Sequence, residues 1–317
     1  MKNKDVCFSE EIKLGENTYT YVWGDDFDGE TLDPSKWTWD CENSGMRSSD
    51  ITELINVDDE RAIRLKNGNV QLIASVLEEK EDGKKLYGTP ASLSTHGKMA
   101  YTYGYCEIRA RVPFGKGLWP GFWATTDCSF IDRDKMNYVA EIDIFEIFGT
   151  LDGVVPNIHK WYKKSNYPYD EIHGEKTNNH TQFNGYKFFY DKNENYYFAE
   201  HQDDISNLNN EFHIYGFEWT PKEMSMYVDG EKYMTYDIVN SYDSSKEMDG
   251  FHQPISILFN NHLFVSSGDF IPEFERGVPT LINGNEEVLP SIFEIDYFRL
   301  YQNKSLTSNK LFVKDKS

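Results

Sequence analysis

The sequence predicts an all-β protein, built as a β-sandwich or a barrel. Three observations support this prediction. Short runs of aromatic and β-branched residues with two-residue periodicity recur along the 317-residue chain, turn signals separate these runs, and no long stretch has the 3.6-residue periodicity of a helix. We therefore expect many short strands and only a few short helices.

The expected strands can be followed in order from the N-terminus. In each run, apolar residues recur at alternate positions, which places them on one face of a strand. The runs are TYTYVW (18–23), NVQLIAS (69–75), YGYCEIRARV (103–112), FHIYGFEW (212–219), MSMYVDG (224–230), PISILF (254–259) and FEIDYFRLY (293–301). Glycine-containing turn signals lie at 66–69, 81–85, 229–230 and 283–285.

The chain is expected to form one domain over residues 16–302. Residues 1–15 and 303–317 are predicted to be tails, because they carry little strand pattern. The polar, tyrosine-rich segment 162–211 is predicted to form long loops, which in a compact domain are usually functional or mobile.

Composition limits the classes of partner. Hydrophobic residues make up 39% and aromatic residues 15% of the chain, enough for a packed core. With 32 basic and 53 acidic residues the net charge is −21, which disfavours nucleic acid, since phosphates are bound mainly by Lys and Arg. The four cysteines have no paired CxxC spacing, so a structural zinc site is not expected, whereas disulfides and isolated thiols both stay open. No apolar stretch approaches the length of a membrane span.

The segment AEIDIFEIFG (140–149) contains three acids, Glu141, Asp143 and Glu146, within an apolar run. A solvated edge strand with an acidic face is one interpretation. Its five large apolar residues, however, demand burial on at least one side. In a regular strand, positions i and i+2 share a face but position i+5 does not. The spacing therefore needs an explanation.

A pair of carboxyls for glycoside hydrolysis would explain this spacing. A retaining mechanism uses two carboxyls about 5–5.5 Å apart, one as nucleophile and one as acid/base. A β-bulge within Ile144–Phe145 would return Glu146 to the face of Glu141. The two would then be four regular steps, or about 13 Å, apart along the backbone, and both side chains can lean inward. Asp143 would hydrogen-bond a neighbouring carboxyl and help to separate the two pKa values.

These residues resemble the bulged E-x-D-x-x-E signature of glycoside hydrolase family 16. Other segments resemble the same family in the same order, over roughly residues 20–302. They are YVWGDDFDGETLDPSKWTWD (21–40), YGYCEIRARVPFGKGLWPGFWA (103–124), FHIYGFEWTPKEMSMYVDGEKY (212–233) and FEIDYFRLYQ (293–302).

The resemblance implies a jelly-roll β-sandwich of two antiparallel sheets with a concave substrate cleft. It implies that Glu141 is the nucleophile, Glu146 the acid/base and Asp143 an assisting residue. It also places four residues near the substrate: Trp119, Trp123, His159 and Trp161. Packing in the core is the alternative for the tryptophans, and a structural or solvated position is the alternative for the histidine. A structural Ca²⁺ held by Asp296 and carbonyl groups near Gly29 is a further implication, and oxygen ligands suit that ion. No organic cofactor is implied.

The expected activity is retaining, endo-acting hydrolysis of a β-linked polysaccharide, most specifically a β-1,3- or β-1,3-1,4-glucan. The segments CENSGMRSSDITEL and FNNHLFVSSGDF depart from the glucan-cleaving pattern, so an agarose-type galactan stays open. The negative charge disfavours a heavily sulfated one. Transglycosylation and a non-catalytic carbohydrate-binding sandwich are the remaining alternatives. We expect a monomer that is secreted or cell-surface, with a cytoplasmic location also open.

Overall fold

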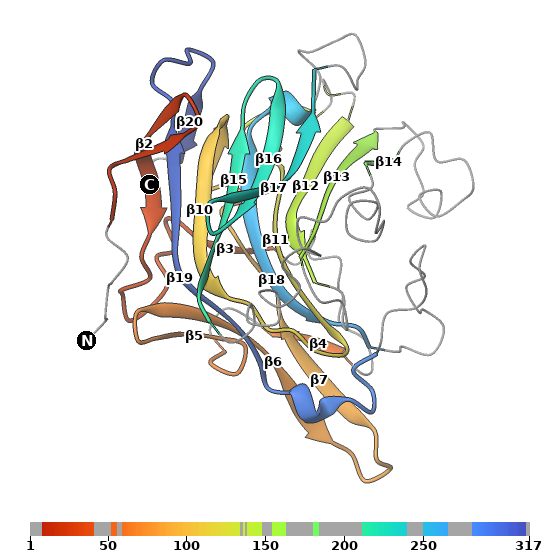
Figure 1. The fold of residues 1–317 in the computed structure, drawn as a ribbon. Coiled ribbons are helices and arrows are strands. Elements are labelled where there is room, and N and C mark those ends of the chain that lie inside the picture. The colour runs from red at the N-terminus through yellow and green to blue at the C-terminus, as the bar shows by residue number, and fades with distance from the viewer. Residues whose placement is uncertain are drawn as a thin grey trace.

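The protein is a jelly-roll β-sandwich of two sheets (Figure 1). The structure, a computed structural model, describes residues 8–40, 52–55, 59–133, 136, 138–147, 154–162, 180–183, 211–239, 250–265 and 281–314. Within these ranges the helical segments are two 3-10 turns, η4 (Gly250–His252) and η5 (Glu286–Val288). The all-β prediction is therefore confirmed. In this described part, neither turn is long or apolar enough to cross a membrane.

The larger sheet has the strand order β17-β16-β15-β10-β19-β6-β7-β4, with β2 joined to β19, β1 joined to β2 and β5 joined to β6. All its pairs are antiparallel except β4 with β7. Its strands are β1 (Glu11–Leu14), β2 (Asn17–Asp25), β4 (Thr52–Ile55), β5 (Ile63–Lys66), β6 (Asn69–Glu79), β7 (Lys85–Pro90), β10 (Gly104–Arg111), β15 (His213–Trp219), β16 (Glu223–Val228), β17 (Glu231–Asp237) and β19 (Ser291–Gln302).

The second sheet has the order β14-β13-β12-β11-β18-β8-β3, with β9 joined to β18 and β20 joined to β9. It contains the acidic segment, which forms most of β12. Its strands are β3 (Thr38–Asp40), β8 (Ser92–Ser94), β9 (Met99–Thr102), β11 (Leu118–Thr126), β12 (Tyr138–Glu146), β13 (Val155–Tyr162), β14 (His180–Phe183), β18 (Ile255–Leu263) and β20 (Lys310–Val313). We call it the β12 sheet below.

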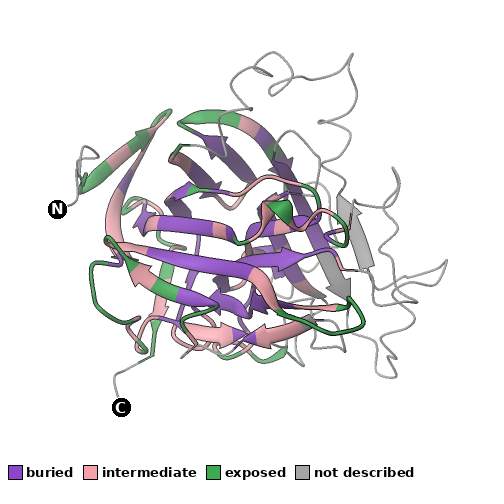
Figure 2. Cartoon of the chain, turned by 90° about the horizontal axis from the view of Figure 1, so that it is seen from below, coloured by how far each residue is buried: buried purple, intermediate pink, exposed green. Residues whose placement is uncertain are grey.

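One hydrophobic core lies between the sheets. It draws alternate residues from the central strands of both, such as Phe122 and Phe259 of the β12 sheet and Phe293 and Phe298 of the larger sheet. Figure 2 shows that the long central strands are buried over most of their length, while exposure concentrates at the connecting turns. Burying this apolar surface is the main driving force for the sandwich.

Two tight hairpin turns occur where the sequence predicts them. Asn67 and Gly68 have φ values of 55° and 73° between β5 and β6, and Asp229 and Gly230 have φ values of 49° and 83° between β16 and β17. Two consecutive residues with positive φ make the type of turn that matches the twist of antiparallel strands, and Asn-Gly and Asp-Gly favour it.

The predicted tails are wrong in part. Within 1–15, Glu11–Leu14 forms β1 and pairs with β2; within 303–317, Lys310–Val313 forms β20 and pairs with β9. Apolar residues of both segments, among them Ile12 and Leu311, pack against the buried clusters. This packing explains why these short strands join the sheets.

Most of the predicted loop segment 162–211 lies outside the described residues, apart from β14 and residues at its two ends. Cys106 and Cys128 are free thiols, whereas Cys7 and Cys41 lie outside the described residues. Burial raises the pKa of the Cys106 thiol to about 12, so this cysteine behaves as a core residue.

Candidate active site

Strand β12 contains the predicted β-bulge, and Ile144 is its extra residue. On one side, Asp143 pairs with Trp123 and Phe145 with Phe122, which leaves Ile144 without a register partner on β11. On the other side, three steps along β12 from Asp143 to Glu146 match only two steps along β13. The bulge prediction is confirmed.

The bulge sorts the side chains of β12 onto two faces. Five apolar residues of this segment lie in the core between the sheets: Ala140, Ile142, Ile144 and Phe145 of β12, and Ile147 just after it. The contacts of Glu141, Asp143 and Glu146 are with polar groups on the opposite face of the β12 sheet. Ile144 and Phe145 are neighbours in sequence and both face the core, as expected at a bulge. All three acids consequently share the outer face.

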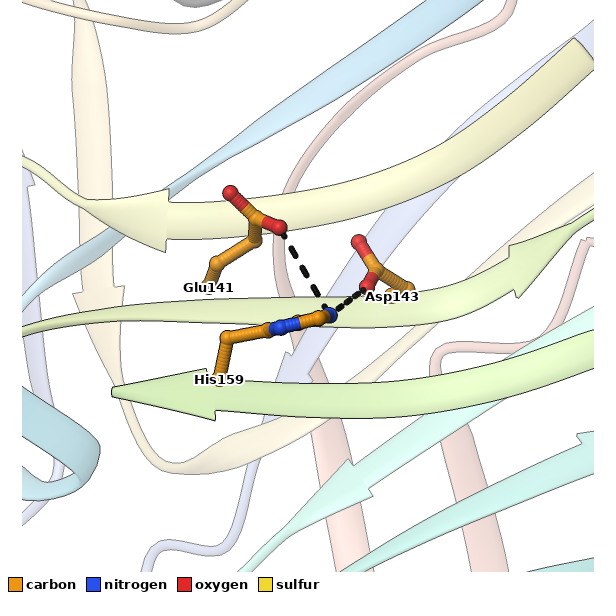
Figure 3. Close-up of side chains that lie close together, drawn as sticks. All are labelled: Glu141, Asp143 and His159. Carbon is orange, nitrogen blue, oxygen red and sulfur yellow. Dashed lines mark hydrogen bonds and ion pairs between the residues drawn. The ribbon is translucent and has the colours of Figure 1, made fainter. Parts of the chain in front are cut away.

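His159 lies between two of these acids. It is paired with Glu141 in the register of β12 and β13, and its Nε2 is 2.9 Å from Asp143 Oδ2 and 3.7 Å from Glu141 Oε1 (Figure 3). The sequence predicted a carboxyl as the hydrogen-bond partner of Asp143. The structure instead gives it this imidazole, because the cross-strand position of His159 lets the ring reach between the two acids.

The three acids differ in exposure and in electrostatic environment. The Asp143 side chain is 6% exposed, whereas the Glu141 side chain is 28% exposed. Burial raises the pKa of Asp143 to about 8. Burial also raises the pKa of Glu146 well above 4.5, and the Asp143 carboxyl raises it further, while the Trp119 hydrogen bond opposes the shift. Glu146 is thus biased towards its protonated form, the form that a general acid needs.

Two tryptophans of β11 line the same face. Trp119 Nε1 donates to Glu146 Oε1 across 2.9 Å, and its ring stacks on Phe264 with the centroids 4.7 Å apart. Trp123 Nε1 donates to Asn260 Oδ1 across 2.8 Å. The family resemblance implied that both tryptophans lie near the substrate, and the structure puts both beside the acidic strand.

Asn260 is a polar residue of this face that the sequence analysis did not select. Its Nδ2 donates to the backbone carbonyl of Trp119 across 2.9 Å while its Oδ1 accepts from Trp123. It therefore links the Trp123 indole to the backbone at Trp119. The signal for it is the change from apolar to polar residues in FNNHLF (259–264), the segment whose departure from the glucan-cleaving pattern leaves a galactan open.

The last predicted substrate residue is Trp161 on β13. Its backbone pairs with Val139, but its side chain lies outside the described part of the structure. Its contact with substrate stays a prediction.

The described residues do not favour the predicted calcium site. Asp296 Oδ2 is 3.0 Å from Arg109 Nη1, so a guanidinium already neutralises this carboxylate and would repel a second cation. Gly29 lies in the exposed loop after β2. The side-chain N and O atoms of Glu141, Asp143 and His159 that could bind a metal lie within 4.8 Å of one another. The hydrogen bond between His159 and Asp143 already explains much of this closeness.

The fold and the site define a class of protein. A β-sandwich presents two glutamates on one face of a bulged strand, with tryptophans alongside and one glutamate biased towards protonation. This combination is characteristic of a carboxylate-dependent glycoside hydrolase. The chain belongs to the glycosyl hydrolases family 16, whose family model matches residues 52–201 and 167–259, more than half of the chain.

Several known proteins are similar to this chain. The β-glucanase of Rhodothermus marinus is 28% identical over 288 residues, which cover 89% of this chain and 84% of that protein. The glucan endo-1,3-β-glucosidase A1 of Niallia circulans is 24% identical over 327 residues, covering 95% of this chain and 41% of that longer protein. The structure of the laminarinase from Rhodothermus marinus matches with a TM-score of 0.57 and 25% identity, covering 90% of this chain and 98% of that one.

Proposed function

We propose that the protein is a retaining endo-glycosidase that hydrolyses a β-1,3- or β-1,3-1,4-glucan by double displacement. The observation that carries this proposal is the β12 bulge, which places Glu146 on the same face as Glu141. If the same sequence formed a regular strand with no bulge, one of these two glutamates would point into an apolar core, where an unpaired carboxylate is strongly disfavoured.

In the first step, Glu141 attacks the anomeric carbon while Glu146 protonates the leaving glycosidic oxygen. The raised pKa of Glu146 keeps a proton available for that transfer. Departure of the leaving group as a neutral alcohol avoids a high-energy alkoxide. The product of this step is a glycosyl ester on Glu141.

In the second step, Glu146 accepts a proton from water, which then attacks the anomeric carbon and releases Glu141. Glu146 can act as a base here because it is deprotonated, having given its proton to the leaving group in the first step. His159 and Asp143 act on the nucleophile: the imidazole 3.7 Å from Glu141 Oε1 orients this carboxylate, and Asp143 holds the imidazole.

A neutral glucan fits the chain better than a charged polymer. The net charge of −21 disfavours a polyanion, and the partly exposed side chains of Trp119 and Trp123 suit the apolar faces of sugar rings. The relatives named above are described as a β-glucanase, a glucan endo-1,3-β-glucosidase and a laminarinase. An agarose-type galactan is the second candidate, because the FNNHLF segment (259–264), which includes Asn260, departs from the glucan-cleaving pattern.

Incubation with laminarin, lichenan and agarose tests the proposal, with reducing ends and product lengths as the readout. We expect internal cleavage of laminarin or lichenan, β-configured first products by NMR, and loss of cleavage in Glu141→Gln. Cleavage of agarose alone would support the galactan instead. Binding without cleavage across the panel would support a carbohydrate-binding sandwich, and products longer than the starting oligosaccharides would show transglycosylation.

A further inference from the structure

A second β-bulge lies in β17, the edge strand of the larger sheet. Met226 pairs with Met234, but the next residue of β16, Tyr227, pairs with Lys232. Tyr233 is therefore the extra residue. In a regular strand it would face away from its neighbour Met234, yet it packs against the same core cluster as Met234 and Tyr236. The β17 bulge turns Tyr233 into the sandwich.

The two bulges contact each other across the core. The hydroxyl of Tyr233, the extra residue of β17, donates a hydrogen bond to the backbone carbonyl of Ile144, the extra residue of β12. The hydroxyl of Tyr236, three residues further along β17, donates to the carbonyl of Pro156 across 3.2 Å. Both hydroxyl groups thus reach the backbone of the β12 sheet from the opposite sheet.

The carbonyls that receive these bonds lie where the β12–β13 ladder is interrupted. Ile144 has no register partner on β11, and the ladder with β13 skips from Asp143–Asn157 to Glu146–Val155. Pro156 lies between those pairs, and a proline has no N–H to donate. A buried carbonyl without a donor is destabilising, so the tyrosines supply hydrogen bonds that an interrupted ladder leaves open.

We propose that Tyr233 and Tyr236 are positioning residues that hold the β12 bulge and so place Glu146 for proton transfer. This inference rests on the catalytic role proposed above for Glu146. The tyrosines do not touch the outer face of the sheet. They act through the backbone at Ile144 and Pro156, two and ten residues from the acid.

The direction of the effect follows from strand geometry. A shift of one residue in register exchanges the two faces of a strand, so relaxation of the bulge would turn Glu146 towards the core. Even a small displacement of a catalytic group is costly, because proton transfer requires hydrogen-bond reach to the leaving oxygen. Burial raises the pKa of Tyr233 well above 10, so its hydroxyl stays a donor across the working pH range.

The chain offers a matched control in Tyr215 of β15. Its ring centroid is 4.7 Å from that of Phe145, inside the same bulge. Its buried hydroxyl has no hydrogen-bond partner among the residues that the structure describes. Tyr215→Phe therefore removes a hydroxyl group from the same neighbourhood without removing a bond to the bulge.

The experiment compares Tyr233→Phe, Tyr236→Phe and Tyr215→Phe on two substrates. One is the polysaccharide that the wild-type protein cleaves, whose leaving oxygen needs an acid. The other is a dinitrophenyl β-glycoside of the same sugar, whose leaving group departs without protonation, so that its kcat/KM reports glycosylation independent of Glu146. We expect Tyr233→Phe to lose about 10- to 100-fold in kcat/KM on the polysaccharide but less than about threefold on the aryl glycoside.

Tyr236→Phe should show the same selectivity with a smaller loss, and Tyr215→Phe should stay near wild type on both substrates. Equal losses on the two substrates, or no loss, would overturn the proposal, because a merely structural role lowers both activities together. Amide hydrogen exchange of residues 142–147 needs no substrate and separates this inference from the proposed function. Exchange should accelerate there in Tyr233→Phe and not in Tyr215→Phe; unchanged exchange would also overturn it.

Discussion

Trp119 donates its indole N–H to the Glu146 carboxylate across 2.9 Å, and this bond opposes the burial that raises the Glu146 pKa. Trp119→Phe keeps an aromatic ring but removes the donor, so the Glu146 pKa should rise further. Since a hydrogen bond to a charged group is worth roughly 1.5–3 kcal/mol and one pKa unit about 1.4 kcal/mol, we expect the alkaline limb of kcat/KM to move up by about one pH unit.

Trp123→Phe is the control for this shift. Its indole donates to the neutral Asn260 and not to a carboxylate, so the alkaline limb should stay in place even if affinity falls. A downward shift in Trp119→Phe, or equal shifts in both variants, would contradict the role assigned to Trp119.

The sequence was sufficient to predict the bulge because its side chains obey a strict period of two on either side of one extra residue. Ile144 and Phe145 are adjacent apolar residues between acids that must not enter the core, and only a bulge reconciles these requirements. The β17 bulge was not predicted. Tyr233 lies in the sequence EKYMTYD. A tyrosine can occupy either the core face or the solvent face of a strand, so the two-residue periodicity of this segment does not reveal an extra residue.

Contacts between strands that are distant in the sequence could not be predicted from the local pattern either. The pairing of His159 with Asp143 depends on the register between β12 and β13, and the pairing of Asp296 with Arg109 depends on the neighbours β10 and β19. Both registers are set by packing of the whole sandwich. Residue type alone therefore suggested a carboxyl partner for Asp143, whereas the observed partner is the His159 imidazole. The family resemblance suggested Ca²⁺ at Asp296, and the pairing of this carboxylate with Arg109 could not be predicted from local pattern.

Asp143→Asn should stabilise the protein at alkaline pH while lowering activity. Burial raises the folded-state pKa of Asp143 from 3.8 to about 8, so the folded state holds this proton more tightly than the unfolded chain. The resulting stability is fully present below pH 3.8 and is lost as the pH rises through about 8. An asparagine avoids that loss, because it never has to ionise in a buried site.

Thermal unfolding at pH 5 and pH 8.5 measures this effect. Since one pKa unit is worth about 1.4 kcal/mol, the variant should gain at least about 1–3 kcal/mol relative to wild type on going from the lower to the higher pH. The amide can still hydrogen-bond His159, which limits any structural cost. A gain that shrinks with rising pH would show that Asp143 is not held in a raised-pKa state.

Gly121→Ala should disturb the two tryptophans from a distance. A Cβ at Gly121 would lie 2.8 Å from Asn260 Oδ1, so the amide that accepts from Trp123 and donates to the Trp119 carbonyl must move. We expect a rise in KM for polysaccharide of about threefold to tenfold and a loss of roughly 1–2 kcal/mol in unfolding free energy.

A double-mutant cycle with Asn260→Ala isolates this clash. Once the amide is gone, the added methyl group has space, so Gly121→Ala should cost little in the Asn260→Ala background. Additive losses in stability and KM would mean that the glycine is needed for another reason, such as close approach of the substrate.

Deletion of Ile144 should preserve the arrangement of the acids, whereas deletion of Ile142 should destroy it. Both residues are fully buried isoleucines of the same strand, so each deletion costs a similar amount of apolar burial, about 2–5 kcal/mol. Without Ile144, β12 becomes a regular strand in which Glu141, Asp143 and Glu146 alternate on one face. Without Ile142, no arrangement of the strand keeps the three acids on one face. If the bulge is retained, Glu141 faces away from the other two acids; if the strand is regular, Asp143 points into the core.

We expect activity within about 100-fold of wild type in the Ile144 deletion and no activity in the Ile142 deletion. Equal activities of the two deletion variants at equal folded fractions would contradict this. Catalysis would then not depend on which face the three acids occupy, and so not on the bulge.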